Sequence, residues 1–484
     1  METTSILNNL REDTIITLKK HEVIDRDNYQ ILIVPETGAW ATISRSDENT
    51  LMCFSESHTA KELKAIGVHN IDKLLDDLFY SGVLTVNDKD VSMIQNHDEN
   101  VEYKKGCDLP LFIVLKYTNA CNLKCAYCYS YDRNKTHNVA IPNEYVYKLS
   151  QLIGDTEKPY KVSICFHGGE PLIRFKDIVE CVDTLKRRRN NNVEFSIPTN
   201  GTLLTPKIAN YLKNEDIAVG ISVDGYDEET NHLRLFANNK SSINSTLNAI
   251  RICQKAGLTP GIISVMTRNN YKNVIDIMTY LSQMGVKAFH FNHFLPTGRG
   301  EKREKDFSVP IQDILDIRIR MLLFINDYNS TKDKDNRINE RFTHNILLSL
   351  VKNEPLTYMC AQSPCGAGRK QLALTYDGSI YPCDDLCNES LFKIGNVNEI
   401  TNIKQILSSS ESVKICQSHC IENIKECRKC IYRKMCISHC CSDSYFYTGG
   451  FNSPHSTCAM IKQLIPNVID LLYRGRIQIE NIIY

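Results

Sequence analysis

The stretch Cys121-Asn-Leu-Lys-Cys125-Ala-Tyr-Cys128 places three cysteines in a C-x3-C-x2-C spacing, directly after the apolar run Leu111 to Tyr117. Three thiolates this close together can hold an iron–sulfur cluster, but a cubane has four irons. One iron would therefore keep an open position where a small molecule can bind. The spacing alone also allows two plainer interpretations, a partial zinc site or three unrelated thiols.

Composition limits the class of protein around this stretch. The 484 residues are enough for about three domains, and Lys plus Arg equals Asp plus Glu at 57 each. This balance gives no electrostatic reason to expect a nucleic-acid or membrane partner. The first residues lack the apolar core of a signal peptide, and no apolar run reaches the ~18 residues of a membrane span. Twenty cysteines argue for metal ligation in a reducing compartment rather than for disulfides, so we expect a cytoplasmic protein.

Residues 109–327 alternate between short apolar runs and amphipathic stretches. The apolar runs cover residues 111–117, 161–166, 193–197, 217–223, 261–266 and 288–294. The amphipathic stretches cover residues 144–153, 176–188, 206–213, 243–256, 274–284 and 311–325. Six such units in succession predict an α/β fold, a parallel sheet with helices outside it. Periodicity alone does not separate an open doubly wound sheet from a partial barrel.

Polar and glycine-rich motifs follow the first four predicted strands. The cysteine triad follows the first strand, Gly168-Gly169-Glu170-Pro171 the second, Thr199-Asn200-Gly201 the third and Asp224-Gly225 the fourth. Parallel α/β folds place their chemistry at the carboxyl ends of the strands. We therefore expect these motifs on one rim, facing one cavity, with the glycines allowing close backbone approach.

The triad and the Gly168-Gly169-Glu170-Pro171 turn together resemble the signatures of the radical SAM superfamily. The resemblance implies a partial (β/α)6 TIM-like barrel and a [4Fe–4S] cluster on Cys121, Cys125 and Cys128, with S-adenosylmethionine on the open iron. It also implies that the glycine-rich turn holds the methionine amino group and that Tyr127 lies near the adenine. Further cofactor contacts, or residues just behind them, would be Ser196, Thr199, Asn200, Ser222 and Arg234. Turn formation and surface solvation are the plainer interpretation of these last five.

Twelve of the twenty cysteines lie between residues 360 and 458, in an ordered spacing. Cys365, Gly378 and Cys383 follow C-x12-G-x4-C, and a C-x2-C-x5-C-x3-C run starts at Cys427, with Cys458 last. This pattern resembles the SPASM extension of radical SAM enzymes, which carries two auxiliary [4Fe–4S] clusters. The resemblance assigns the first cluster to Cys360, Cys365, Cys383 and Cys440, and the second to Cys427, Cys430, Cys436 and Cys458. A tetrahedral zinc site on residues 427–440 is the alternative.

Asp384 directly follows Cys383. By resemblance to anaerobic sulfatase-maturating enzymes, an aspartate at this place acts as a base that removes a substrate proton. Asp385 duplicates the residue type, and capping of the local turn is the plainer interpretation. The cysteines without a predicted place are Cys387, Cys416, Cys420 and Cys441. Those interpreted as small apolar residues of the core or linker are Cys53, Cys107, Cys165, Cys181 and Cys253.

The predicted architecture has modules on both sides of the barrel. Residues 1–95, with a strand-like start, helical stretches and a final short strand, suggest a winged-helix-like module. This layout resembles the peptide-recognition element of radical SAM peptide maturases, and a helical cap on the catalytic domain is the alternative. The remaining parts are a linker at 96–108, the barrel at 109–327, a hinge with a bridging helix at 328–350, the SPASM domain at 351–460 and a C-terminal helix or tail at 461–484.

The resemblance implies an enzyme that generates a 5′-deoxyadenosyl radical and uses it to oxidise or crosslink a ribosomally made peptide, through a thioether or carbon–carbon bond. Its partners would be a precursor peptide or protein bound through a leader, and an electron donor such as flavodoxin or ferredoxin. Formylglycine formation on a sulfatase is the alternative that Asp384 favours. An iron–sulfur electron carrier or scaffold would use the same cysteines, but it has no need of the turn at residues 168–171.

Overall fold

A computed structural model describes residues 6–66, 70–90, 112–131, 139–154, 162–188, 192–351, 356, 359–387 and 389–483. Contacts divide the chain into two compact units: the smaller joins Met1–Gly106, Ser349–Pro355 and Glu426–Cys436, and the larger holds Cys107–Leu348, Leu356–Lys425 and Ile437–Tyr484. The predicted domains, which are continuous in sequence, stay a prediction. The linker at 96–108, including Cys107, lies outside the described residues. No described helix is both long and apolar enough to cross a membrane.

The larger unit is built on a ten-stranded sheet in the order β14-β13-β12-β11-β10-β9-β8-β15-β16-β17. Six neighbouring parallel strands form its main part. They are β8 (Phe112–Thr118), β9 (Val162–Gly168), β10 (Val193–Thr199), β11 (Ile217–Ser222), β12 (Gly261–Met266) and β13 (Ala288–His293). The strands β14 and β17 remain at the two edges, so the described sheet is open and curved. This arrangement confirms the prediction of six strand–helix units.

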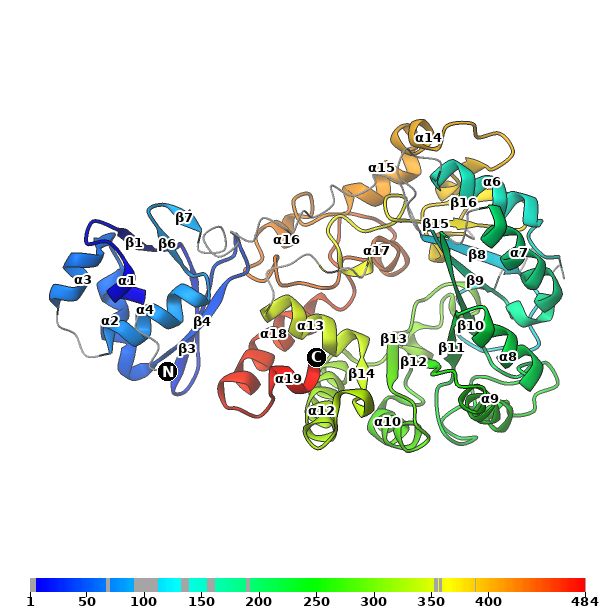
Figure 1. Ribbon diagram of the computed structural model, residues 1–484, viewed down its shortest axis with the longest axis horizontal. Helices are drawn as coiled ribbons and strands as arrows, with labels where there is room; N and C mark the ends of the chain where they lie inside the picture. Colours follow the sequence, from blue (N-terminus) through cyan, green and yellow to red (C-terminus); the bar gives the residue numbers. More distant parts are fainter. Residues whose placement is uncertain are drawn as a thin grey trace. The chain divides into compact units, whose positions relative to one another are not determined.

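Helices cover the outer face of this sheet (Figure 1). They are α6 (Asn143–Gly154), α7 (Phe175–Arg188), α8 (Pro206–Asn214), α9 (Ile243–Lys255), α10 (Val274–Gln283) and α12 (Ile311–Ser330). In α7 the buried residues are Ile178, Cys181, Val182 and Leu185, a spacing of three and four that forms one apolar stripe. At the start of α8, the Thr205 side chain accepts a hydrogen bond from Ile208 N, and Pro206 occupies the first turn, where its missing N–H is harmless.

Residues 328–340 lie within the stretch predicted as a hinge with a bridging helix, and that assignment stays a prediction. The helix α12 continues to Ser330, and β14 (Asn339–Glu340) pairs in parallel with β13. Ser330 to Asn336 are exposed, as their polarity suggested, whereas polar side chains at the two ends of the stretch are buried in hydrogen bonds. Glu340 is fully buried and pairs with Arg318 at 3.3 Å, and Asn329 Nδ2 donates to Ile338 O at 2.8 Å. Composition alone does not distinguish these buried polar residues from the exposed ones between them.

The C-terminal cysteine-rich region extends the same sheet. The strand β15 (Gln371–Leu374) pairs in parallel with β8, and β16 (Ser379–Tyr381) and β17 (Gly395–Asn396) follow in antiparallel order. Gly378 turns the chain between β15 and β16 with φ of +80°. This pairing brings the short helix η8 (Asp384–Leu386) into contact with β8. Further helices are α13 (Arg341–Val351), α14 (Ile403–Ser409), α15 (Glu411–Ser418), α17 (Cys441–Thr448), α18 (Cys458–Tyr473) and α19 (Ile479–Ile482).

The smaller unit has two antiparallel sheets around one apolar core. One sheet holds β2 (Glu22–Asp25), β3 (Tyr29–Ile33) and β4 (Trp40–Ser44), and the other holds β1 (Ile15–Leu18), β5 (His58–Thr59), β6 (Leu84–Val86) and β7 (Lys89–Asp90). Its helices include α2 (Glu48–Leu51), α3 (Ala60–Ile66) and α4 (Ile71–Tyr80). Two helices followed by the β6–β7 hairpin, with β1 beside β6, form a winged-helix layout. The strands β1 and β2 are additions that sequence analysis did not predict.

The segment Glu426–Cys436 belongs to this smaller unit through specific contacts. Arg433 forms an ion pair with Glu36, and Ser349 Oγ donates to Met435 O at 3.0 Å. A Cβ on Gly38, in the turn between β3 and β4, would lie only 3.0 Å from Lys434 Cβ. Three cysteines predicted as cluster ligands are thus part of the unit that also contains the winged-helix layout.

Candidate active site

The cysteine triad lies on a loop that leaves the carboxyl end of β8 and is pinned along its length. Lys124 N donates to Leu235 O at 2.8 Å, and Ala126 N donates to Leu233 O at 3.0 Å. Burial raises the pKa of Cys121 to about 11 and that of Cys125 to about 12. The three thiols lie close together: Cys128 is near enough to raise the pKa of Cys121, and Cys121 is near enough to raise that of Cys125. Three adjacent thiols on one loop are a donor set that fits an iron–sulfur cluster, since a bound metal replaces the protons.

The glycine-rich turn packs directly against this loop. Gly169 N donates to Thr118 O at 2.6 Å, and Glu170 N donates to Ala120 O at 2.8 Å. A Cβ on Gly169 would lie 2.2 Å from Ala120 O, so only glycine fits. The structure therefore brings together the ends of β8 and β9, which sequence analysis predicted as one rim.

Glu170 ties the turn to the end of β10. Its fully buried carboxylate accepts from Thr199 Oγ1 at 2.7 Å, Leu172 N at 3.0 Å and Asn200 N at 2.8 Å. Burial raises the pKa of Glu170 despite these hydrogen bonds. The Asn200 side chain also reaches the triad loop, where Nδ2 donates to Asn122 Oδ1 at 2.9 Å. Thr199 and Asn200 thus lie at the rim, where cofactor contacts were predicted. The Thr199 hydroxyl, however, donates its hydrogen bond to Glu170.

Tyr127 is held in place by hydrogen bonds to two further polar side chains, Asp224 and Arg234. The Tyr127 hydroxyl donates to Asp224 at the end of β11 and accepts from Arg234 Nη1 at 2.9 Å. Arg234 lies within electrostatic range of Cys125 and Glu170, and its buried Nε has no hydrogen-bond partner among the described residues. An unpartnered guanidinium N–H beside the triad is a fit for an anionic group, such as a cofactor carboxylate.

The other predicted cofactor contacts lie differently. Ser196 is in the middle of β10 rather than at the strand end, and its side chain hydrogen-bonds to the Cys165 thiol. Ser222 ends β11 and is half-buried. Pro171 begins the short helix η3 (Pro171–Arg174) and is buried, so it shapes the turn. The structure therefore gathers Tyr127, Asn200 and Arg234 around the triad and leaves Ser196 away from it.

Asp384 lies in a polar network that sequence analysis did not anticipate. Tyr129 Oη donates to Asp384 Oδ2 at 2.7 Å, and Lys116 Nζ lies 4.0 Å from the same oxygen. His167 Nδ1 accepts from Gly168 N at 2.7 Å, so the proton of the neutral ring is on Nε2, 3.2 Å from Tyr129 Oη. The aspartate that follows Cys383 thus contacts residues from β8, β9 and the triad loop.

The two adjacent aspartates have different proton affinities. Burial alone would raise the pKa of Asp384, but Lys116, His167 and Tyr129 outweigh it and hold that pKa below its usual value. Burial and the charge of Asp384 raise the pKa of Asp385 to about 7. Burial, followed by the nearby Lys116 charge, lowers the pKa of His167 to about 4, so its imidazole is neutral at pH 7. Asp384 is therefore the ionised member of the pair.

The four cysteines predicted for the first auxiliary cluster lie together in the larger unit. The Cys360 thiol hydrogen-bonds to Cys440, and both Cys365 and Cys383 lie close enough to Cys360 to raise its pKa. Cys440 and Cys365 likewise raise the pKa of Cys383. Cys441, which had no predicted place, hydrogen-bonds to the Cys365 thiol and to Cys416. Four clustered thiols fit a cluster ligand set. For the second cluster, Cys427, Cys430 and Cys436 belong to the smaller unit and Cys458 to the larger, so that assignment stays a prediction.

The described geometry defines an α/β enzyme of the partial-barrel class, with a cysteine triad and a glycine-rich turn at neighbouring strand ends. Residues 115–281 match the radical SAM superfamily, and residues 365–431 match the SPASM iron–sulfur cluster-binding domain. The chain belongs to the radical SAM superfamily and carries a SPASM domain. These matches confirm the predicted classes of cofactor, iron–sulfur clusters and S-adenosylmethionine.

Two relatives and two solved structures illustrate the similarity. A protein of Methanocaldococcus jannaschii, uncharacterised, is 30% identical over 299 residues, covering 60% of this chain and 90% of that protein. A cysteine-type anaerobic sulfatase-maturating enzyme of Clostridium novyi is 27% identical over 339 residues, covering 66% and 84%.

Among solved structures, anSMEcpe with bound AdoMet has a TM-score of 0.65 at 20% identity, covering 76% of this chain and 99% of that one. Streptococcus suis SuiB bound to its precursor peptide SuiA has a TM-score of 0.55 at 16% identity, covering 93% and 99%. These two likenesses show the shared fold.

Three residues of the Asp384 network were missed because each has an ordinary local explanation. Lys116 is a single lysine in an otherwise apolar strand, His167 precedes a glycine turn, and Tyr129 follows the third triad cysteine. The lysine was the available signal, since a charge in a strand covered on both faces needs a partner. Its partner, Asp384, is remote in sequence and could not be named without the β8–β15 pairing.

Proposed function

We propose that this radical SAM enzyme modifies a ribosomally made peptide by oxidation or by a thioether or carbon–carbon crosslink. The observation that carries this proposal is the extent of the likeness to SuiB, which takes in 93% of the chain, against 76% for anSMEcpe. The winged-helix layout of residues 6–66 and 70–90 supports a leader-binding role for the smaller unit, with strand addition as the mode. The twenty cysteines of the chain support a reducing, cytoplasmic location for the enzyme.

The triad cysteines Cys121, Cys125 and Cys128 would hold the cluster that binds S-adenosylmethionine. When bound, this pair supplies a 5′-deoxyadenosyl radical that removes a hydrogen atom from the substrate. Around it, the glycine at 169 lets the backbone come close, and Glu170 presents a buried acceptor for an amino group. The Arg234 Nε–H offers a donor to a carboxylate. These groups bind and orient the cofactor and exclude water from the reacting centre.

Asp384 is the proposed base. It is ionised, its side chain is 20% exposed, and Tyr129 and Lys116 both contact Oδ2. A substrate N–H, O–H or S–H proton would move to the carboxylate as the substrate is oxidised. The auxiliary clusters, the first of which Cys360, Cys365, Cys383 and Cys440 would hold, would supply an acceptor for the electron released. A flavodoxin or ferredoxin would supply the electron that starts the cycle.

Formylglycine formation on a sulfatase is the second candidate. It is supported by the position of Asp384 directly after Cys383 and by the 27% identity to the Clostridium novyi enzyme. The two candidates differ in substrate recognition, because a leader-dependent maturase needs the N-terminal residues of its precursor.

Anaerobic turnover followed by mass spectrometry tests both candidates. The full-length, cluster-containing enzyme is incubated with each precursor peptide encoded beside its gene, with and without the leader, and in parallel with a sulfatase peptide containing the target cysteine. We expect a mass change only in the leader-containing precursor. Modification of the sulfatase peptide alone would overturn the preferred assignment.

Cys125→Ala tests the radical chemistry itself, with Cys253→Ala as the matched control. Cys125 is a predicted cluster ligand, whereas Cys253 lies in the outer helix α9. We expect the first variant to lose S-adenosylmethionine cleavage and the second to keep it. Unchanged 5′-deoxyadenosine yield in Cys125→Ala would refute the assignment of the triad.

A further inference from the structure

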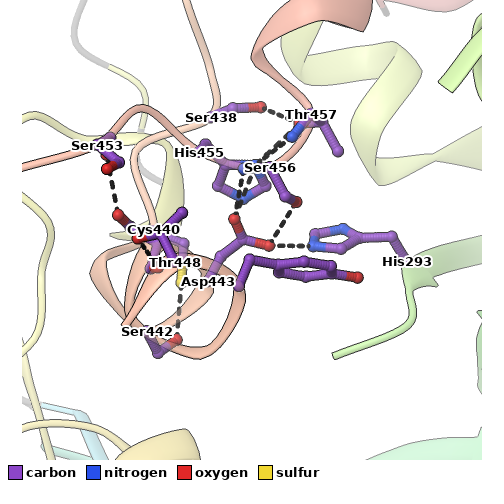
Figure 2. A network of polar contacts seen from close by, with 12 residues as sticks. His293, Ser438, Cys440, Ser442, Asp443, Thr448, Ser453, His455, Ser456 and Thr457 are labelled. Carbon is purple, nitrogen blue, oxygen red and sulfur yellow. Dashed lines mark hydrogen bonds and ion pairs between the residues drawn. The ribbon is translucent and has the colours of Figure 1, made fainter. Parts of the chain in front are cut away.

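Three side chains that commonly bind metal converge where β13 ends. His293 is the last residue of β13, Asp443 lies in the first turn of α17, and His455 lies in the loop before α18. Figure 2 shows both imidazoles directed at the Asp443 carboxylate. His293 Nε2 lies 2.8 Å from Asp443 Oδ2, and His455 Nδ1 lies 3.4 Å from Oδ1. One ligand atom from each residue lies within 4.8 Å of the other two.

The carboxylate of Asp443 is enclosed. Its side chain is 2% exposed. Ser456 donates to it twice, from N to Oδ1 at 2.6 Å and from Oγ to Oδ2 at 2.8 Å. Within the part of the chain that the structure describes, the basic side chains in contact with it are the two histidines, which carry a charge only when protonated. Removing an ion from water costs several kcal/mol unless an opposite charge accompanies it, so this carboxylate needs a cation.

The contact between Asp443 and His455 also favours a cation. Thr457 N donates to His455 Nδ1 at 3.1 Å, and the Thr457 hydroxyl lies 2.9 Å from the same atom. Because a backbone N–H can only donate, Nδ1 carries a lone pair. Asp443 Oδ1 is also an acceptor, so two acceptors face each other across 3.4 Å with no proton between them. Their repulsion is strong in an enclosed site, and a cation between them attracts both.

The spacing of these atoms suits a small divalent ion. Two ligand atoms bound about 2.1 Å from a tetrahedral Zn²⁺ lie about 3.4 Å apart. This value agrees with the separation of Oδ1 and Nδ1. His293 Nε2 lies closer to Asp443 Oδ2, at 2.8 Å, so these two atoms would separate slightly to admit the ion. The imidazoles would present their lone pairs to the ion, so that it replaces the present contacts to Thr457 N and between His293 and Asp443.

We propose that His293, Asp443 and His455 bind a divalent first-row transition metal, with Zn²⁺ as the preferred ion, at a site separate from the cysteines. The donor set of two nitrogens and one oxygen is typical of such ions and unlike the all-sulfur ligation of the clusters. Three protein ligands leave a coordination position free for water. His293, with 31% of its side chain exposed, lies on the side that solvent reaches. The site joins the last main strand of the barrel to the helix that follows Cys440.

Metal analysis of the anaerobically purified, cluster-containing enzyme tests the proposal. The enzyme is incubated with equimolar zinc sulfate, desalted, and analysed for zinc, iron and sulfide, and the zinc ligands are identified by X-ray absorption at the zinc edge. The ligand variants are His293→Gln and Asp443→Asn. His293 is the least buried of the three, so its variant is the safer to fold. Ser456→Ala is the matched control, because it touches the same carboxylate but leaves all three ligands.

We expect wild type and Ser456→Ala to retain a zinc ion whose first shell contains nitrogen and oxygen at about 2.0–2.1 Å. Both ligand variants should lose about one zinc per chain while their iron and sulfide contents stay unchanged. A first shell of sulfur at about 2.3 Å would place the zinc on cysteines and overturn the proposal. Equal zinc in all four proteins, or none in wild type, would also overturn it. This test does not use turnover, so its failure would leave the proposed peptide modification standing.

Discussion

Asp384 and Asp443 are two aspartates in the same cysteine-rich region, and their surroundings differ in one decisive respect. Each follows closely on a cysteine predicted for the first auxiliary cluster, and each contacts a strand of the barrel. Asp384 has Lys116 on β8 as a cationic neighbour, whereas Asp443 has His293 on β13 and His455. A lysine supplies a permanent charge, but a neutral imidazole supplies a lone pair.

The same residue type therefore suits two roles beside one predicted cluster, that of a base and that of a metal ligand. Lys116 keeps Asp384 ionised while leaving it 20% exposed, which suits a group that accepts a proton from a substrate. Asp443 is almost fully enclosed among acceptors and donors of its own chain, which suits a metal ligand or a structural link.

The largest effect is expected from Asp384→Asn. The amide keeps the shape of the side chain but removes the proton acceptor, so modified product should fall by about 10²–10⁴-fold. Cleavage of S-adenosylmethionine should continue, because Asp384 is not among the groups proposed to bind the cofactor. Mass spectrometry of the peptide and of 5′-deoxyadenosine in one reaction measures both. The matched control, Asp385→Asn, should lose far less product, and equal losses in the two variants would contradict the assignment of the base.

Lys116→Met should destabilise the enzyme by about 3 kcal/mol, because it leaves Asp384 mostly buried without its cation. Anaerobic denaturant unfolding measures the loss. The double variant Lys116→Met/Asp384→Asn should recover most of it, since the uncompensated charge is then absent. If the two substitutions simply add, Lys116 does not neutralise Asp384 and the contrast with Asp443 disappears.

Ser456→Ala removes the hydroxyl donor to Asp443 and keeps the backbone donor. A hydrogen bond to an ionised group contributes about 1.5–3 kcal/mol, so we expect a loss of about 2 kcal/mol in the free energy of unfolding. The loss should be smaller in Asp443→Asn, where the acceptor carries no charge. A double-mutant cycle on these two residues gives the coupling, and zero coupling would exclude Ser456 as a support for the carboxylate.

The smallest effect concerns pH. The pKa of His167 is lowered to about 4, below its value of about 6.5 in the unfolded chain. Between these values the unfolded state binds the additional proton, so acidification lowers stability. His167 alone should make the enzyme about 1 kcal/mol less stable at pH 5.5 than at pH 7.5. His167→Gln should reduce this pH dependence by that amount, and an unchanged dependence would show that the imidazole is not kept neutral by its surroundings.

Much of the fold was predictable because its signals are local. The six apolar runs became β8–β13 in chain order, and the helices between them agree with the predicted stretches to within a few residues at their ends. The polar stretch 328–340 is exposed in its middle, but Asn329 and Glu340 near its ends are buried, a difference that composition did not show. The strand Ile15–Leu18 was missed because four residues carry little periodic signal.

The sequence by itself determined the cysteine spacing, the glycines at 168 and 169, and the strand–helix alternation, because each depends on backbone geometry within a few residues. Only the tertiary structure decided which side chains meet. The pairing of β15 with β8 brought Asp384 to Lys116, and the packing of α17 at the end of β13 brought Asp443 to His293. These side-chain contacts depend on which strand pairs with the free edge of a sheet. The spacing of residues along the chain does not indicate that pairing.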